Sequence, residues 1–227
     1  MDTNKLVNTY TVNKLQTYDE CPQRYKLCYI DNVKILENPI FSKKAEKGNN
    51  LHNLINFYLK GQNTSKLVTA LTHNEKILWI NFKESEIKNY NIRESEYAFN
   101  VKIDEYWLTG RIDALFEHDN KYIILDWKTG ENFKGNQVKF QTAFYLLSIY
   151  EILKAKRLIK SPEQLELHYM NIATNTTIRI QLDENKYIQY RTKILEIINK
   201  INTNPNFFCH KSDQCKTCKY CRACPYY

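Results

Sequence analysis

The sequence predicts an α/β (α+β) domain built on one central sheet with helices around it. Strand-like segments follow one another at about 94–103, 105–116 and 120–128, and a second pair follows at about 165–172 and 176–182. Helical patterns flank both groups, which is typical of this class. The chain has 227 residues, 43% hydrophobic and 13% aromatic, and no internal repeat. We therefore expect residues 1–227 to form one well-packed domain.

Apolar residues at helical spacing define the helical segments. The clearest pattern lies in 43–60, where Leu51, Leu54, Ile55 and Tyr58 fall on one face. Four further helices are expected at about 11–30, 65–90, 136–155 and 184–202, the last ended by Pro205.

Charge and hydropathy limit the functional classes. The chain carries 33 basic and 25 acidic residues, a net charge of +8 and a pI near 9.0, which favours a polyanionic partner such as nucleic acid. No run of about eighteen apolar residues exists, so no membrane partner is expected. The first residues lack the apolar stretch of a signal peptide, which indicates an intracellular, cytoplasmic protein.

Acidic residues interrupt the ends of two otherwise apolar strands. Asp113 ends one predicted strand, and Asp126-Trp127-Lys128 ends the next. Side chains alternate along a strand, so Asp126 and Lys128 share a face. A hairpin through the loop 117–120 brings Asp113 beside Asp126. Two carboxylates and an ammonium suit a divalent metal and an activated water attacking a phosphodiester; the plainer alternative is a solvated surface hairpin.

Cysteines are concentrated at the two ends of the chain. Cys21 and Cys28 lie near the N-terminus, and five of the seven cysteines lie in residues 209–227. In an intracellular protein such clustering indicates a metal or an inorganic cluster rather than disulfides. The tail at 205–227 is too short to fold alone, so either it is disordered or a bound inorganic centre holds it.

Five motifs together resemble the RecB- and AddB-like nucleases of the PD-(D/E)xK superfamily. Gly110-Arg111-Ile112-Asp113 and Asp126-Trp127-Lys128-Thr129-Gly130 resemble its paired catalytic motif. Three other segments, in the family's order, are similar to its Gly-x-x-x-His, Gln-x-x-x-Tyr and N-terminal cysteine motifs: Gly48-Asn49-Asn50-Leu51-His52, Gln141-Thr142-Ala143-Phe144-Tyr145 and Cys21-Pro22-Gln23-Arg24-Tyr25.

The resemblance implies a restriction-endonuclease-like core with a central mixed sheet flanked by helices. It places an N-terminal cysteine motif at 11–30, the nuclease core at 43–155 and a cysteine-rich tail at 205–227 that closes an iron–sulfur centre.

The same resemblance implies a role for each motif residue. His52, Asp113, Asp126 and the carbonyl of Trp127 would ligate Mg²⁺ or Mn²⁺. Lys128 would orient or activate the attacking water. Gln141 and Tyr145, four residues apart on one helical face, would lie near the scissile phosphate or the lysine; Glu96 matches an acidic position of some relatives. The alternatives are a surface histidine for His52 and a core helix stripe for Tyr145.

Cluster-bearing relatives use one N-terminal cysteine and three C-terminal ones spaced Cys-x-x-Cys-x5-Cys. Cys21, Cys215, Cys218 and Cys224 fit that pattern and suit a [4Fe–4S] cluster. Cys221 departs from it: Cys215, Cys218, Cys221 and Cys224 form a ladder that suits Zn²⁺ instead. Cys28 and Cys209 are interpreted as auxiliary thiols.

The expected function is a metal-dependent DNA exonuclease or end-processing nuclease acting on single-stranded DNA or free ends. The resemblance implies a setting in CRISPR adaptation or in phage recombination and repair, with a CRISPR integrase or phage replication complex as partner. A catalytically silent nucleic-acid-binding subunit and an iron–sulfur redox carrier are the alternatives. Basic and aromatic tail residues would line a path for single-stranded DNA: Lys211, Lys216, Lys219, Tyr220, Arg222, Tyr226 and Tyr227.

Overall fold

A six-stranded mixed sheet forms the centre of the computed structural model, which describes residues 8–35, 50–129, 139–203 and 206–227. The strand order is β1-β3-β4-β5-β6, and β2 pairs with β3 along its whole length. The β1–β3 and β4–β5 pairs are parallel and the others antiparallel. The strands are β1 (Thr9–Tyr10), β2 (Asn91–Ile103), β3 (Tyr106–His118), β4 (Lys121–Lys128), β5 (Leu165–Asn171) and β6 (Thr176–Gln181).

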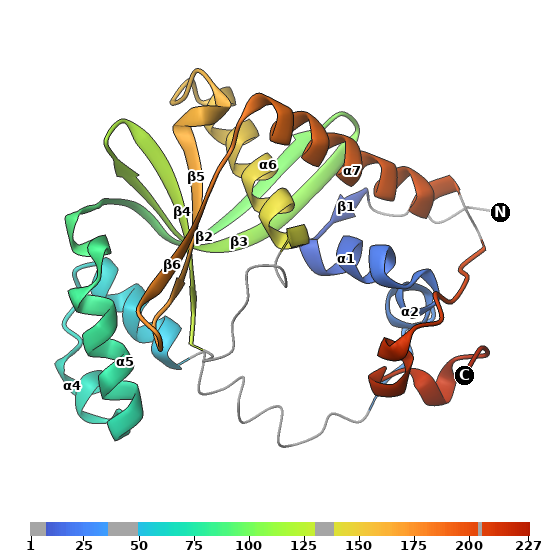
Figure 1. Cartoon of the computed structure of the whole chain (residues 1–227), viewed down its shortest axis with the longest axis horizontal. Coiled ribbons are helices and arrows are strands. Elements are labelled where there is room, and N and C mark those ends of the chain that lie inside the picture. The colour runs from blue at the N-terminus through green and yellow to red at the C-terminus, as the bar shows by residue number, and fades with distance from the viewer. Residues whose placement is uncertain (1–7, 36–49, 130–138, 204–205) are drawn as a thin grey trace.

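Two helical layers cover the sheet (Figure 1). The longest helices, α6 and α7, pack with α1 over one face, and α5 packs with the helix at residues 50–59 over the other. Besides the helix at 50–59, the described residues form α1 (Val12–Glu20), α2 (Pro22–Tyr25), α4 (Ser65–Thr69), α5 (His73–Glu84), α6 (Lys139–Ala155), α7 (Glu184–Thr203), a π-turn (Lys26–Ile30), and the 3₁₀ turns Glu86–Asn89, Pro162–Gln164, Asp213–Thr217 and Cys221–Ala223.

Strand β4 contributes side chains to two hydrophobic cores, one on each face of the sheet. Ile124 packs into the core beneath α6, while Ile123, Leu125 and Trp127 pack into the core beneath α5. Successive side chains of a strand point to opposite faces, so a strand buried on both faces reads as a continuous apolar run. The α/β class and the central mixed sheet predicted from the sequence are therefore confirmed.

The helix predicted at 11–30 is wrong in one respect, because it is broken at Cys21. This residue is extended (φ −161°, ψ 107°) between α1 and α2. Pro22 occupies the first position of α2, and a proline disfavours helical geometry in the residue before it. The chain therefore turns at Cys21.

Other predicted boundaries also shift. The segment 65–90 is interrupted, because Thr72 forms a capping box with Glu75 and starts a new helix. Only two residues, Asp119 and Asn120, separate β3 from β4, both with positive φ as type I′ turns require. The sequence shows no strand pattern at β1, which is only two residues long, so this strand was not predicted. Residues 43–49, 136–138, Gly130 and Pro205 lie outside the described residues.

The tail at 206–227 packs against the first helices. The backbone N–H of Gln23 donates to the carbonyl of Phe208 (3.3 Å), and the Tyr25 ring stacks on Phe207 with centroids 6.1 Å apart. The tail therefore lies beside α2 (Figure 1). Among the described residues, every helix falls short of the length and apolar character that a membrane crossing needs.

Candidate metal centre and nuclease site

The candidate site lies where β3 and β4 separate. Their backbone pairing ends at Ala114 and Leu125. Two residues beyond Leu125, the backbone N–H of Trp127 donates to the carboxylate of Asp113, 3.0 Å away, in place of a backbone carbonyl. The fork thus places the side chain of Asp113 beside the end of β4, as the hairpin argument predicted.

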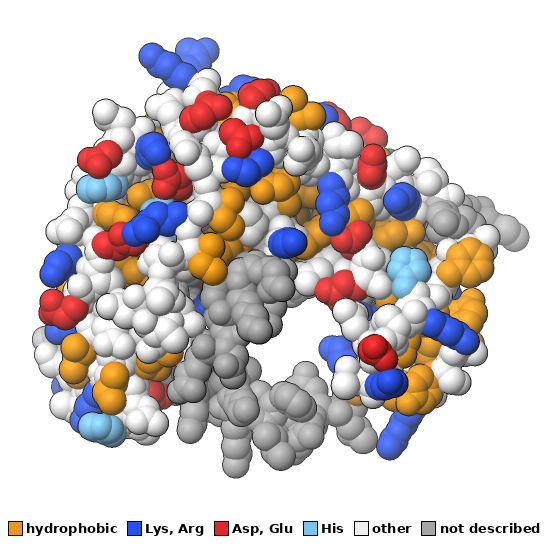
Figure 2. Space-filling model, viewed as in Figure 1, with side chains coloured by type: hydrophobic (Ala, Val, Ile, Leu, Met, Phe, Trp, Pro, Cys, Tyr) orange, Lys and Arg blue, Asp and Glu red, His pale blue; other side chains and the backbone are white. Residues whose placement is uncertain are grey.

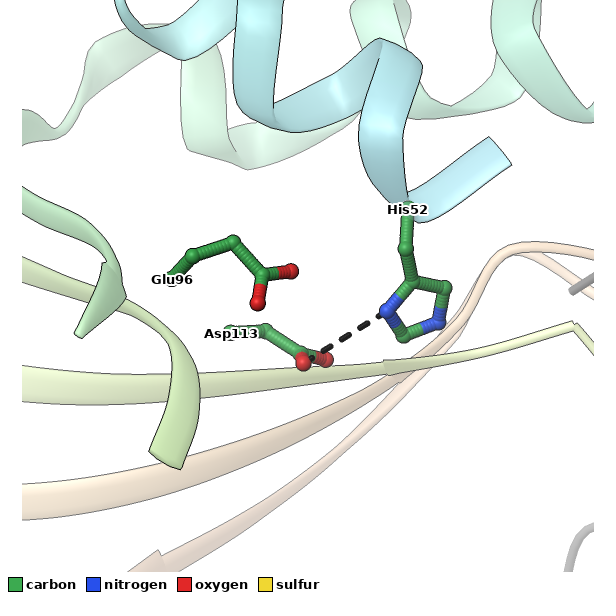
Figure 3. Close-up of side chains that lie close together, drawn as sticks. All are labelled: His52, Glu96 and Asp113. Carbon is green, nitrogen blue, oxygen red and sulfur yellow. Dashed lines mark ion pairs between the residues drawn. The ribbon is translucent and has the colours of Figure 1, made fainter. Parts of the chain in front are cut away.

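Three ligand-type side chains converge at this fork. One nitrogen of His52 and one carboxylate oxygen each of Glu96 and Asp113 all lie within 4.8 Å of one another. Figure 3 shows His52 descending from the helix at 50–59 toward Asp113, with Nδ1 3.5 Å from its carboxylate. The His52 ring also packs on Trp127, with centroids 5.4 Å apart. A nitrogen and two hard oxygen donors suit a divalent cation such as Mn²⁺ or Mg²⁺.

Glu96 reaches this group because of an irregularity in β2. The pairs Ser95–Ala114 and Tyr97–Ile112 place Glu96 opposite Asp113. Its backbone is left-handed (φ 51°), a conformation that costs a non-glycine residue about 1–2 kcal/mol. Such strain persists only where the surroundings fix it, and it is concentrated at functional sites. Arg111 Nε, 2.9 Å from the Glu96 carboxylate, also holds this side chain.

A close contact with Phe99 explains why a glycine occupies position 110. It lies opposite Phe99 in the β2–β3 pairing. A Cβ at position 110 would come within 2.7 Å of the Phe99 ring, which is a clash. The glycine therefore lets the Phe99 ring cover the strand next to the site.

Asp126 makes its own pair of side-chain contacts at the fork. One oxygen lies 2.6 Å from Lys128 Nζ, and the other accepts from the Gln141 side chain at 3.1 Å. The carboxylate is only 5% exposed. Burial raises the pKa of Asp126 to about 6, helped by the charge of Asp113 and opposed by Lys128. Gln141, on α6, therefore contacts the Asp126 carboxylate, and its place near the phosphate or the lysine stays a prediction.

Tyr145 has a visible structural contact. Its hydroxyl donates to the carbonyl of Arg111 (3.0 Å), one turn of α6 beyond Gln141. Burial raises the pKa of Tyr145 to about 12, so it stays protonated. It ties α6 to β3 two residues before Asp113. This contact supports positioning of the site, and it leaves the predicted role near the phosphate untested.

The tail presents basic side chains to solvent. Lys211, Lys216, Lys219 and Arg222 are exposed, as is Tyr227. Figure 2 shows lysine and arginine side chains on this part of the molecule.

The prediction for Tyr220 as a stacking surface is wrong, because this ring is only 6% exposed. Burial, followed by the neighbouring Cys28, raises its pKa to about 12. The ring therefore belongs to the packing between the tail and the first helices.

Cysteines line a cavity of about 310 Å³ between the tail and α1–α2. All four predicted iron–sulfur ligands and Cys221 lie on its wall. So does Cys209, which the sequence analysis interpreted as an auxiliary thiol. The structure thus brings Cys21 next to the tail, which sequence order alone does not require.

Comparison with known proteins agrees with this geometry. Residues 9–225 match the family described as the PD-(D/E)XK nuclease superfamily. The chain belongs to that superfamily. As a PD-(D/E)XK nuclease, it carries its paired acids and lysine at the fork of β3 and β4, and its sheet and helical layers agree with a restriction-endonuclease-like fold.

Individual relatives of this PD-(D/E)XK nuclease are distant. A 74-residue segment, 33% of the chain, is 32% identical to the RecBCD enzyme subunit RecB of Chlamydia muridarum, and it spans 7% of that subunit. The crystal structure of a Eubacterium rectale protein, provisionally assigned as an exonuclease, matches 96% of this chain and 93% of its own at 10% identity and TM-score 0.54, which shows the shared fold. The structure of SSO0001 matches 99% of this chain and 89% of its own at 19% identity and TM-score 0.48.

Proposed function

We propose that this PD-(D/E)XK nuclease is a Mg²⁺- or Mn²⁺-dependent DNA exonuclease that processes single strands or free ends. The observation that carries the proposal is the convergence of His52, Glu96 and Asp113 beside the Asp126–Lys128 pair. Superfamily members use divalent metals, and the donor set of this chain fits one.

Each side chain has a role that its contacts support. His52, Glu96 and Asp113 would hold the ion, and Asp126 would add a ligand once its oxygens reorient from Lys128 and Gln141. A bound ion polarises a phosphoryl oxygen and lowers the pKa of its water. Lys128 would orient the attacking water and offset the charge that develops on the phosphate. Gln141 would hold the Asp126 carboxylate in place.

We further propose that the nuclease works with DNA-handling partners. The net charge of +8 and the exposed basic tail favour a polyanionic substrate. A CRISPR integrase and a phage replication or recombination complex are the two partner classes that the sequence resemblance implies.

We propose a [4Fe–4S] cluster as the group bound in the cysteine cavity. The chemistry of the wall fits, because six thiols from both ends of the chain face one cavity. Such a cluster would hold the tail on the nuclease core. A zinc ion held by the Cys215, Cys218, Cys221 and Cys224 ladder is the second candidate, and all four of these residues also lie on that wall.

The decisive experiment is a cleavage assay with end-labelled substrates. We expect single-stranded and blunt or overhanging duplex DNA to be degraded from an end in Mg²⁺ or Mn²⁺ and to survive in EDTA. A covalently closed circle should resist. Binding of all substrates with no cleavage in either metal would instead establish the silent binding subunit. Redox cycling without cleavage would establish the iron–sulfur carrier.

A further inference from the structure

Arg111 places a guanidinium beside the candidate metal centre. Its Nε lies 2.9 Å from the carboxylate of Glu96, and that carboxylate faces His52 and Asp113 (Figure 3). Glu96 therefore links the arginine to the group of ligand-type side chains. The backbone of Arg111 is held as well, because its carbonyl accepts a hydrogen bond from the Tyr145 hydroxyl at 3.0 Å. The base of the side chain and one of its nitrogens are thus fixed next to the site.

The rest of this guanidinium is open to solvent. The side chain of Arg111 is 69% exposed, whereas that of Glu96 is 16% exposed. Within the described part of the chain, Glu96 is the only carboxylate within ion-pair distance of Arg111. An arginine offers five N–H donors in a planar fork, which matches the oxygens of a phosphate. The exposed end of Arg111 can therefore bind an anion that approaches the site.

A second arginine on the same two strands shows the contrasting case. Arg93, on β2, pairs with Glu117 on β3, and both its Nε and one terminal nitrogen donate to that carboxylate. Glu117 lies outside the group of ligand-type side chains at the fork. Arg93 thus forms the same kind of cross-strand pair without a neighbouring metal centre, which makes it a matched control for Arg111.

The charges around the site favour an anion at Arg111. In their ionised forms, Glu96, Asp113 and Asp126 carry three negative charges, which Lys128 and one divalent ion would balance. Arg111 therefore supplies the net positive charge that a phosphodiester, with its single negative charge, would meet at this fork.

We propose that Arg111 is a substrate-binding residue whose terminal nitrogens hold a phosphate of the DNA backbone beside the metal ion, while Glu96 keeps its Nε in place. The inference rests on the proposed DNA nuclease function, and it adds a residue that touches the substrate rather than the metal. The contact is a charge-assisted hydrogen bond, which is stronger than a neutral one.

The DNA contact is tested by fluorescence anisotropy of labelled single-stranded DNA in Mn²⁺ over a range of salt concentrations. Every chain also carries Lys128→Ala, so that the DNA stays intact. We expect Arg111→Gln to weaken binding by about 10-fold at low salt. The slope of log affinity against log salt should become shallower by about 0.7, the value of one phosphate contact on a single strand. Arg93→Gln should keep the affinity and the slope of its parent.

Calorimetric Mn²⁺ binding without DNA separates this role from a structural one. If Arg111 only held Glu96 as a ligand, Arg111→Gln would weaken Mn²⁺ binding. The proposal expects the Mn²⁺ affinity to stay equal or to rise, because the variant removes a positive charge beside Glu96. Arg111→Lys keeps the charge without the planar fork, so it should recover part of the DNA affinity.

Three results would overturn the role of Arg111. The first is unchanged DNA affinity and salt slope in Arg111→Gln, and the second is an equal loss in Arg93→Gln. The third is a fall in Mn²⁺ affinity as large as the fall in DNA affinity. A wild-type chain that neither binds nor cleaves DNA would overturn the proposed function and the role of Arg111 with it, and the cleavage assay detects that case separately.

Discussion

Lys128 Nζ lies 2.6 Å from the carboxylate of Asp126, and both side chains project from one face of β4. The strand's alternation fixes this pairing, since residues two apart share a face. The buried carboxylate has its charge compensated by the ammonium, and the ammonium is held at the fork where the acids meet.

This pair gives the first prediction. Asp126→Ala and Lys128→Ala should each lower DNA cleavage by about 10²-fold or more, because the first removes a proposed metal ligand and the second removes the ammonium that orients the attacking water and offsets charge on the phosphate. DNA binding should persist, since affinity comes mainly from dispersed phosphate contacts. Lys121→Ala is the control: Lys121 lies on the same strand but is paired with Glu166. Wild-type cleavage by either site variant would refute the assigned site.

The second prediction concerns His52. His52→Ala should raise the Mn²⁺ or Mg²⁺ concentration for half-maximal cleavage by about 10–100-fold, the effect typical of losing a residue that supports a metal. Metal titrations of cleavage measure it. His73→Ala serves as control, because His73 is exposed at the start of α5. An unchanged metal requirement would make His52 a packing residue against Trp127.

A third prediction separates the metal role of Glu96 from general surface charge. Glu96→Gln should raise the metal concentration for half-maximal cleavage, as His52→Ala does, since a neutral amide is a poorer ligand than a carboxylate. Glu94→Gln, an exposed glutamate on the same strand, should leave the titration unchanged. Calorimetric Mn²⁺ binding gives a readout independent of cleavage; equal affinity in both variants would contradict the assignment.

The fourth prediction follows from His168, which is buried on β5. Burial lowers its pKa below the ordinary 6.5, outweighing the opposing effect of Glu166. The charges of Arg179 and Glu86 act on it as well. As the pH falls, the unfolded chain therefore binds a proton at His168 before the folded chain does. The contribution of His168 to the free energy of unfolding is fully present above about pH 6.5, and it is lost as the pH falls toward the lowered pKa.

Melting temperatures measured from pH 8 to pH 5 test the direction in which stability changes with pH. The contribution of His168 is measured as a difference, because Asp126, whose pKa is raised to about 6, titrates in the same range with the opposite effect on stability. Relative to His168→Gln, which keeps a hydrogen-bond donor for Glu166, the wild type should lose stability below about pH 6.5. The His73→Gln variant should behave as the wild type does. Glu166 also has a lowered pKa, but its window lies below 4.5 and is outside the range. Identical slopes in all three proteins would contradict the prediction.

A fifth prediction distinguishes iron from zinc. Protein purified without oxygen should be brown, hold about four irons per chain and lose colour on oxidation. Cys21→Ser should remove the iron, and Cys221→Ser should keep it. The zinc candidate requires the reverse, because Cys221 belongs to its ligand set and Cys21 does not. Colourless protein with stoichiometric zinc under both aerobic and anaerobic purification would decide for zinc.

Local patterns predicted most of this molecule. The five longer strands and the meeting of Asp113 with the end of β4 follow from periodicity and short connections. The placement of Gln141 near the site came from the resemblance to RecB-like nucleases. Glu96 was only weakly indicated, because its place opposite Asp113 depends on a register shift between Ile92 and Glu94. No local signal in the sequence fixes such a shift.

The cysteine cavity also could be predicted only in part from the sequence. Clustering predicted an inorganic centre, and spacing suggested which thiols hold it. The position of Cys209 depends on a contact across 185 residues, between Gln23 and Phe208, which spacing cannot reveal. The roles of the site residues stay predictions until the variants are measured.

The contact between Gln23 and Phe208 has a consequence for engineering. It links residues 23 and 208, so the N-terminal helices and the tail hold each other in place. Deleting residues 206–227 would remove the Phe207 ring that stacks on Tyr25. Deleting the first helices would remove the contacts that Gln23 and Tyr25 make with the tail. A circular permutant that joins the old termini and opens the turn at Asp119–Asn120 would preserve both sides of that contact.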